Sequence, residues 1–202
     1  MKILVLADPW SKIKPRTDTS LALARESWER RHAVYWATPE NVWLEKGKVF
    51  VRATQCLGFT PESLPELGEE EVKPIRGFSS VWIRRDPPFD SAYLSLCWLL
   101  ALEEKHTLFV NRPSVLVRYH EKLLPFEAMA QGFLKATDLV PTHIGDAASA
   151  RSFLQVGAWK EAIRKPFFGF GGSDVKRFSV ESGGALPREN ELELTQPFLT
   201  EV

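Results

Sequence analysis

The sequence opens with an unbroken run of apolar and β-branched residues, KILVLA at 2–7, which is typical of a strand buried on both faces. After a polar loop, SLALARESWERR at 20–31 has the apolar spacing of an amphipathic helix. AVYWA at 33–37 then predicts a second strand. A strand, a helix and a strand in this order form a βαβ unit, so the chain is expected to build a parallel sheet.

Strands and helices continue to alternate through the first half of the chain. A hairpin is predicted at 42–51, where Gly47 can take a positive φ in the turn, and single strands are predicted at 80–85 and 107–111. The apolar segment between these two strands predicts a helix that Asp90 caps. This alternation favours an α/β fold with an open, doubly wound sheet.

The pattern changes in the middle of the chain. Residues 57–77 hold three prolines, several glutamates and three glycines, and are expected to form a surface loop. Short helices and a linker follow, and we place a domain boundary near 112–120. The predicted domains are therefore residues 1–118 and residues 119–202.

The second half reads as a smaller, mixed unit. LVPTHIGD predicts a strand that ends in Asp146, which caps the helix after it. Two strands at 159–168 and 174–180 are joined by a glycine-rich loop, which suggests an antiparallel pair. LTQPFL at 194–199 is a final apolar strand, expected to lie at an exposed edge of its sheet.

The composition excludes several classes of partner. Lys and Arg together number 26, as do Asp and Glu, so no net field favours nucleic acid or an acidic membrane. Cys56 and Cys97 have no metal or redox spacing and indicate a reducing compartment. No stretch approaches the roughly 20 apolar residues that span a bilayer, and the N-terminus lacks the pattern of a signal peptide. A cytoplasmic protein is expected.

The loop KPFFGFGG at 165–172 is the strongest local candidate for a binding function. Glycine N–H groups can approach a phosphate closely, and Lys165 would supply a positive charge to the same anion. The lysine precedes the glycines and no GK[ST] follows, so this is not a P-loop. Phe168 and Phe170 would then pack over a bound base and exclude water. A mobile hairpin turn is the structural alternative, and the spacing alone does not decide between the two.

Several motifs resemble the bacterial glutathione synthetases, which belong to the ATP-grasp ligase superfamily. They run collinearly through almost all of the chain: DP at 8–9, DTS at 18–20, RRDPPFD at 84–90, FVNRP at 109–113, EKLL at 121–124, KPFFGFGG at 165–172 and QPFL at 196–199. The order of RRDPPFD, VNRP and EKL is the specific part of this signature. The resemblance implies a Rossmann-like N-terminal domain with a parallel sheet, followed by part of an α+β ATP-grasp domain.

The resemblance also implies an activity, which is ATP-driven peptide-bond formation through an acyl phosphate. The expected reaction joins γ-glutamylcysteine and glycine to give glutathione, with ATP and Mg²⁺ as cofactors. Lys122 and Lys165 would contact the phosphates, and Gly169, Gly171, Gly172 and Ser173 would form the phosphate lid. The adenine edge would lie along Gln196, Pro197, Phe198 and Leu199, where the Pro197 carbonyl accepts and the Leu199 N–H donates. No catalytic residue is assigned.

Candidate substrate contacts lie in the N-terminal half. Arg85 and Asp86 follow a predicted strand, where open α/β sheets bind ligands, and would hold the carboxylate and amine of a dipeptide. Asp18 and Ser20 are further candidates, although both also suit a helix cap, and capping is the preferred role for Ser20. The four histidines have no ligand spacing and are expected to play no part in a site.

Two departures from the family pattern limit this reading. Phe168 stands where the family often has a polar residue, commonly Asp, before the first loop glycine. The acidic and Asn ligands for Mg²⁺ belong to the family's C-terminal portion, beyond Val202. We therefore expect the 202-residue chain to bind ATP weakly or not at all and to form no peptide bond alone. A non-catalytic nucleotide- or peptide-binding module and a sister ATP-grasp ligase stay open as alternatives, as does a homo-oligomer.

Overall fold

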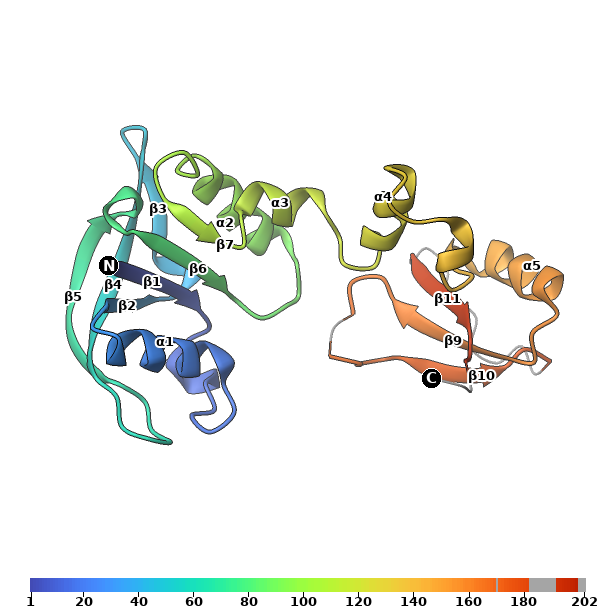
Figure 1. Ribbon diagram of the computed structural model, residues 1–202, viewed down its shortest axis with the longest axis horizontal. Coiled ribbons are helices and arrows are strands. Elements are labelled where there is room, and N and C mark those ends of the chain that lie inside the picture. The colour runs from blue at the N-terminus through green and yellow to red at the C-terminus, as the bar shows by residue number, and fades with distance from the viewer. Residues whose placement is uncertain (170, 182–191, 200–202) are drawn as a thin grey trace. The chain divides into compact units, whose positions relative to one another are not determined.

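The chain divides into two compact units, Met1–Tyr119 and His120–Val202, which are coloured from blue to green and from yellow to red in Figure 1. The structure is a computed structural model that describes residues 1–169, 171–181 and 192–199. Phe170, which the sequence suggested as a lid residue, lies outside the described residues. Each unit has its own sheet, and the two are described in turn.

The first unit, whose residues are all described, is built on a seven-stranded mixed sheet. The strand order is β3-β4-β2-β1-β6-β7, with β5 added to β4. Strands β2, β1, β6 and β7 are parallel, and β3, β4 and β5 extend the sheet in antiparallel fashion. The strands are β1 Lys2–Ala7, β2 Ala33–Ala37, β3 Val42–Glu45, β4 Lys48–Gly58, β5 Glu66–Pro74, β6 Ser80–Arg84 and β7 Leu108–Val110.

Helices cover both faces of this sheet, as a doubly wound fold requires. Alternate residues of β1 point to opposite faces, so Leu4 and Leu6 join the core beneath α2 (Ser91–Ala101). Val5 and Ala7 join a second core beneath α1 (Thr19–Glu29). Figure 1 shows α1 on one side of the sheet and α2 and α3 (Pro113–Arg118) on the other. The expected parallel α/β core is confirmed, and so is the hairpin predicted at 42–51, which is β3 with β4. The addition of β5 to this hairpin was not predicted.

The expectation of a surface loop at 57–77 is wrong for most of this stretch, since only 59–65 forms a loop between two strands. Strand β4 continues to Gly58, and β5 returns alongside it with antiparallel pairs such as Val51 with Lys73. Most side chains of β5 are exposed. Because an edge strand that keeps its side chains in water needs no apolar alternation, its glutamates and glycine gave the sequence the appearance of a loop.

The second unit holds a four-stranded antiparallel sheet among its described residues, in the order β10-β9-β11-β8. Helix α5 packs on this sheet through a small core in which Leu154 lies with Ala162 and Phe178. The elements are α4 Leu124–Ala130, β8 His143–Gly145, α5 Ala147–Gly157, β9 Glu161–Pro166, β10 Lys176–Ser179 and β11 Glu193–Pro197. The predicted antiparallel pair across the glycine loop is β9 with β10.

The last strand is not an exposed edge, contrary to expectation. Strand β11 lies between β9 and β8, and Leu194 pairs with Lys165 on one side and with Ile144 on the other. Its residues Glu193–Thr195 are buried. The apolar run that suggested an edge therefore belongs to an interior strand of the sheet.

Three aspartates cap the long helices. The side chains of Asp90 and Asp146 accept the backbone N–H groups of Tyr93 and Ser149, each at 2.8 Å, as predicted. Helix α1 is capped by Asp18, which accepts from the Leu21 N–H at 2.8 Å. The expected capping role of Ser20 is therefore wrong, because the N-cap lies two residues earlier and the helix already begins at Thr19.

A buried ion pair fastens the β3–β4 hairpin to the segment after α2. Glu103 is 1% exposed and accepts from Arg76 Nε at 3.1 Å and Nη2 at 3.0 Å, and from the Val49 N–H at 3.1 Å. Burial raises the pKa of the Glu103 carboxyl, but the hydrogen bonds from Arg76 and Val49, together with the charges of Arg76 and His106, leave this pKa below its ordinary value.

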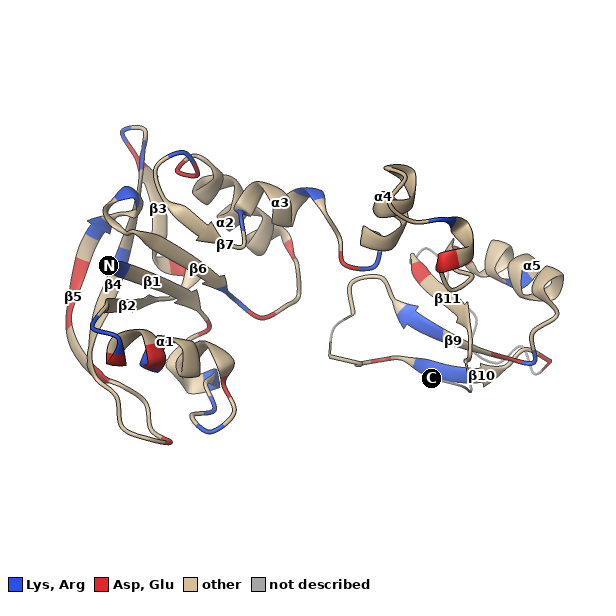
Figure 2. Cartoon of the chain, viewed as in Figure 1, with Lys and Arg blue, Asp and Glu red and all other residues tan. Residues whose placement is uncertain are grey.

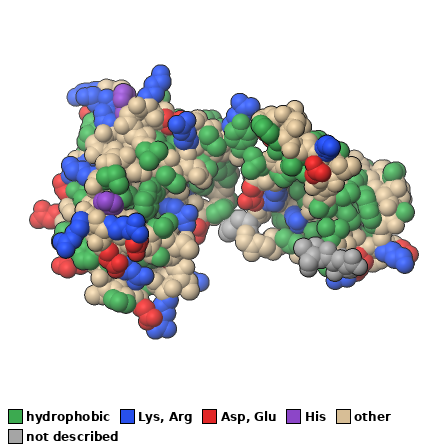
Figure 3. All heavy atoms as spheres, in the orientation of Figure 1, with side chains coloured by type: hydrophobic (Ala, Val, Ile, Leu, Met, Phe, Trp, Pro, Cys, Tyr) green, Lys and Arg blue, Asp and Glu red, His purple; other side chains and the backbone are tan. Residues whose placement is uncertain are grey.

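The surface carries both signs of charge. Positive and negative side chains intermingle over the face of the first unit that Figure 3 displays, in keeping with 26 basic and 26 acidic residues. Within the described residues, every helix is too short or too polar to cross a bilayer.

Candidate functional site

A pocket of about 530 Å³ lies in the second unit, where β9 and β11 face the glycine loop and the segment before α4. This volume is within the range of small-molecule sites. The pocket brings together seven of the residues proposed from the sequence to bind ATP: Lys122, Lys165, Gly169, Gly171, Gly172, Ser173 and Gln196. Basic side chains are concentrated on β9 and β10, as the blue segments of Figure 2 show.

Lys122 reaches across to the glycine loop. Its Nζ donates to the backbone carbonyls of Phe167 at 2.8 Å and Gly169 at 2.6 Å, and lies 3.4 Å from a carboxylate oxygen of Glu121. The side chain is 14% exposed. The ammonium therefore lies at the pocket wall and fastens the loop to the segment before α4.

Lys165 is held in place by a neighbouring strand of the sheet. Its Nζ donates to Gln196 Oε1 at 2.9 Å, and Gln196 Nε2 donates to Thr142 Oγ1 at 2.8 Å. This chain of hydrogen bonds crosses from β9 to β11 and on to the residue before β8. It fixes the position of the ammonium group while leaving it two further donor hydrogens.

The glycine loop has the backbone conformation that its sequence suggested. Gly171 and Gly172 have φ of +59° and +74°, in the left-handed region that L-residues with a side chain rarely adopt. A Cβ at Gly169 would lie 3.0 Å from the Pro166 ring, so this position is also restricted, here by contact. The hydroxyl of Ser173 contacts its neighbour Asp174 at 3.3 Å.

The remaining residues of the proposed adenine strand are arranged differently. The Pro197 backbone pairs with Ala162, and the Phe198 N–H donates to the Glu161 carbonyl at 3.0 Å. The Phe198 ring lies 3.7 Å from the guanidinium carbon of Arg177. Gln196 is the member of this strand that lines the pocket as the described residues define it.

An aromatic cluster beside the pocket was missed by the sequence reasoning. His120 stacks on Phe167 with ring centroids 4.1 Å apart and meets the edge of Phe168 at 5.6 Å. Burial lowers the pKa of His120, and the nearby charge of Lys122 lowers it further. His120 therefore supports the loop beside the pocket, although it is not among the described residues that line the pocket.

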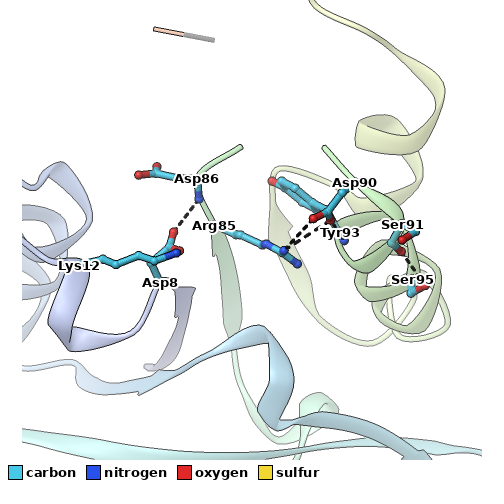
Figure 4. A network of polar contacts seen from close by, with 8 residues as sticks. All are labelled: Asp8, Lys12, Arg85, Asp86, Asp90, Ser91, Tyr93 and Ser95. Carbon is cyan, nitrogen blue, oxygen red and sulfur yellow. Dashed lines mark hydrogen bonds and ion pairs between the residues drawn. The ribbon is translucent and has the colours of Figure 1, made fainter. Parts of the chain in front are cut away.

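A second cluster of polar groups lies in the first unit, at the carboxyl ends of β1 and β6. The Asp86 N–H donates to Asp8 Oδ2 at 2.8 Å, and Arg85 Nη2 lies 3.4 Å from Asp90 Oδ1 (Figure 4). The Arg85 guanidinium also lies over the Tyr93 ring, 5.5 Å from its centre. Arg85 and Asp86 are thus at the sheet edge where the sequence placed them, while Asp8 had been given no role.

Asp18 and Ser20 are engaged within the fold. The Asp18 carboxylate caps α1, and Ser20 is 5% exposed with its hydroxyl accepting from Arg84 Nε at 3.0 Å. Arg84 Nη2 also donates to the Thr19 hydroxyl at 2.7 Å. These residues connect the start of α1 to the end of β6, immediately before Arg85.

The described residues do not provide a magnesium site. Across 1–169, 171–181 and 192–199, no three side chains of His, Cys, Asp or Glu gather closely enough to hold a metal ion. The acidic residues that line the pocket are Glu121 and Asp138, and Glu121 is paired with Lys122. Mg²⁺ keeps several waters and is usually bound through one or two carboxylates together with the phosphates of a substrate, so the described residues hold no preformed cage for it.

This fold is that of the ATP-grasp proteins. The crystal structure of a D-cycloserine synthetase matches 98% of this chain and 59% of its own with a TM-score of 0.61, at 14% identity. An ATP-grasp RimK-domain protein from Sphaerobacter thermophilus matches 100% of this chain and 66% of its own with a TM-score of 0.55, at 15% identity. Similarity at these identities establishes the fold alone.

The sequence model of the prokaryotic glutathione synthetase N-terminal domain matches residues 1–117, and the chain belongs to that family. Glutathione synthetase from Ralstonia nicotianae is 32% identical over 185 residues, covering 90% of this chain and 54% of that protein. The enzyme from Prochlorococcus marinus is 30% identical over 187 residues, covering 91% and 57%. The enzyme from Coxiella burnetii is 36% identical over 126 residues, covering 61% and 39%.

The chain spans about half the length of the curated relatives it matches. The activity, the substrates and the partners of the whole protein are therefore matters for proposal.

Proposed function

We propose that the chain supplies the dipeptide-binding and phosphate-binding parts of an ATP-dependent ligase that joins γ-glutamylcysteine and glycine. In this proposal, residues 1–118 form the glutathione synthetase N-terminal domain and residues 119–202 form the first part of the ATP-grasp domain. Its partners are small molecules, namely ATP, a dipeptide and an amino acid, and the cytoplasm supplies all three.

The observation that carries the proposal is the pocket of the second unit. Lys165 and Lys122 both line it, together with Gly171 and Gly172 of the glycine loop. Two ammonium groups next to a loop of positive-φ glycines suit a polyphosphate, because the loop backbone can approach the phosphate oxygens closely. Gln196, with Pro197, Phe198 and Leu199 after it, would then run along the adenine.

The proposed chemistry needs positioning and charge neutralisation more than covalent catalysis. The cysteinyl carboxylate of γ-glutamylcysteine attacks the γ-phosphorus of ATP, and ADP leaves. The glycine amine then attacks the acyl carbon, phosphate leaves and the amine loses a proton. Lys122 and Lys165 would stabilise the negative oxygens of the transferred group. Because the described residues form no magnesium site, no step is assigned to a metal ion.

The dipeptide is assigned to the carboxyl edge of the sheet in the first unit. Arg85 suits a carboxylate and Asp86 suits an ammonium group, and the two are adjacent. Asp18 and Ser20 would act less directly, by fixing the start of α1 and the position of Arg84 beside this edge.

Calorimetric titration with MgATP tests the nucleotide site in the chain itself. We expect weak but saturable binding that inorganic triphosphate displaces, because both contact the two lysines. Wild-type chain that shows no saturable binding would contradict the proposed pocket. Ligation is then measured as ADP release with γ-glutamylcysteine and glycine, using the protein as its gene encodes it. Binding of nucleotide and dipeptide without ADP release would favour a non-catalytic binding module.

A further inference from the structure

The two neighbouring strands β1 and β6 both end in an Asp-Pro pair. The strands are parallel, and their last matched residues are Ala7 and Arg84. Asp8-Pro9 follows the first strand, and Asp86-Pro87 follows the second after one intervening residue. A residue before proline is restricted to extended conformations, so both aspartates continue the direction of their strands.

The side chain of Asp8 continues the pairing where the backbone ladder stops. Its Oδ2 accepts the Asp86 N–H at 2.8 Å, and its Oδ1 lies 3.4 Å from Lys12 Nζ. The Asp8 side chain is only 16% exposed, whereas that of Lys12 is 70% exposed. The shorter contact, to a backbone group, is therefore the one that fixes the Asp8 carboxylate, and a charged acceptor strengthens it.

This bond sets the directions of the two side chains that flank it. Arg85 points toward Asp90 and Tyr93 at the start of α2, whereas the Asp86 side chain points away from them (Figure 4). The contacts of Arg85 Nη2 with the Asp90 carboxylate are long, at 3.4 and 3.5 Å. These contacts orient the guanidinium but are too long to use up its hydrogen-bond donors. The guanidinium therefore keeps donors for a ligand carboxylate.

We infer that Asp8 is a positioning residue for the recognition of a ligand whose carboxylate and ammonium groups lie at separate ends, as in a dipeptide. By holding the Asp86 backbone, Asp8 presents a guanidinium on one side of the strand end and a carboxylate on the other. A ligand that carries both a carboxylate and an ammonium group matches this pair of charges. The inference rests on the proposed function for the identity of the ligand, which there is γ-glutamylcysteine.

Three variants of the chain separate the possible roles of Asp8. Asp8→Ala removes the acceptor, Asp8→Asn keeps an oxygen acceptor without the charge, and Lys12→Ala removes only the longer contact. Amide hydrogen exchange at Asp86 reports the backbone bond directly. Calorimetric titration reports affinity for γ-glutamylcysteine, and titration with MgATP serves as the control ligand. Thermal unfolding confirms that each variant is folded.

We expect Asp8→Ala to accelerate exchange at Asp86 and to weaken γ-glutamylcysteine binding about tenfold, the usual effect of losing one charge-assisted hydrogen bond. In Asp8→Asn, the Asp86 exchange rate and the γ-glutamylcysteine affinity should both lie within about threefold of wild type. Lys12→Ala should leave the exchange rate and the affinity unchanged. The affinity for MgATP should be the same in all variants. Unchanged exchange and unchanged dipeptide affinity in folded Asp8→Ala would overturn the role of Asp8. Wild-type chain that does not bind the dipeptide would overturn the proposed substrate, while accelerated Asp86 exchange in Asp8→Ala would still support the positioning contact.

Discussion

The ammonium group of Lys122 lies 2.6 Å from the backbone carbonyl oxygen of Gly169, the first glycine of the loop that borders the pocket. The same group binds the Phe167 carbonyl at 2.8 Å. Lys122, which was expected to contact the ATP phosphates, thus binds the glycine loop that would cover those phosphates. Bound nucleotide and loop carbonyls would compete for the same donors.

Replacing Lys122 by Met should loosen the glycine loop while leaving the sheet intact. Both carbonyl contacts are lost, and each is a hydrogen bond from a charged donor. We expect chymotrypsin to cleave after Phe167 or Phe168 several-fold faster in Lys122→Met than in wild type. Glu121→Gln is the matched control, because it removes the ion pair but keeps the ammonium group. Equal cleavage rates in all three proteins would show that Lys122 does not restrain the loop.

The titration of His120 should report the same contact. Burial lowers the pKa of His120, and the positive charge of Lys122 lowers it further. Lys122→Met removes the second cause, so the pKa should rise toward the ordinary value of 6.5 while staying below it. The His120 ring protons in NMR spectra give the midpoint. Lys165→Met, which removes a pocket charge that does not contribute to the lowered pKa of His120, should move the midpoint less. A midpoint at or above 6.5 in wild type would contradict the buried, stacked position.

Lys165→Ala should weaken MgATP binding without unfolding the second unit. One charged contact to a phosphate is worth about 1.5–3 kcal/mol, or roughly tenfold to a hundredfold in affinity. Lys176→Ala is the control, since Lys176 is an exposed lysine on β10 that does not line the pocket. Calorimetry on both variants decides the assignment. Nucleotide affinity that is the same in Lys165→Ala and Lys176→Ala would remove Lys165 from the proposed site.

Arg85→Ala should act on the dipeptide rather than on the nucleotide. Loss of the guanidinium removes the proposed carboxylate contact, and we expect the affinity for γ-glutamylcysteine to fall about tenfold. The affinity for MgATP should equal that of wild type within measurement error, since the nucleotide site is assigned to the second unit. Arg16→Ala removes an exposed arginine that pairs with Glu62 and should change neither affinity. An equal loss for both ligands would return the RRDPPFD segment to a structural role.

The ion pair between Glu103 and Arg76 should make the first unit sensitive to acid. The folded-state pKa of Glu103 lies below its ordinary value of 4.5, so its stabilising contribution is present above pH 4.5 and is lost as pH falls through the folded pKa. Glu103→Gln should lower the free energy of unfolding by about 1–3 kcal/mol at pH 7 and flatten its decline below pH 4.5. Urea unfolding across this pH range measures both. Glu26→Gln, which breaks an exposed pair with Arg30, should cost less than about 0.5 kcal/mol.

The core of the first unit was predictable because its strands carry a strong and local signal. Leu4 and Leu6 face one core, and Val5 and Ala7 face the other. An uninterrupted apolar run indicates a strand that is buried on both faces in this way. Strand β5 was not predictable in the same way. Its pairing with β4 satisfies backbone groups while its side chains stay in water, and backbone pairing leaves little trace in the side-chain sequence.

The pocket residues could be proposed from sequence, but their contacts could not. Gly171 and Gly172 are recognisable because few other residues tolerate a positive φ. The hydrogen bonds of Lys122 to Phe167 and Gly169 join positions more than forty residues apart. The same limit applies to Asp8 and Asp86, which pair across 78 positions. Contacts of this kind follow from strand order, which short motifs do not encode.

The central place of β11 also bears on how the protein folds as it is synthesised. The sheet of the first unit is complete once residue 110 has left the ribosome, and all of its strands can then pair. In the second unit, β8 is paired with β11 alone among the described strands, although fifty residues separate His143 from Glu193. Strand β8 must therefore stay unpaired for about the time needed to translate those residues, and the side of β9 that pairs with β11 stays unpaired for a shorter time. During that interval the unpaired strand edges of the nascent chain can bind chaperones or associate with other nascent chains.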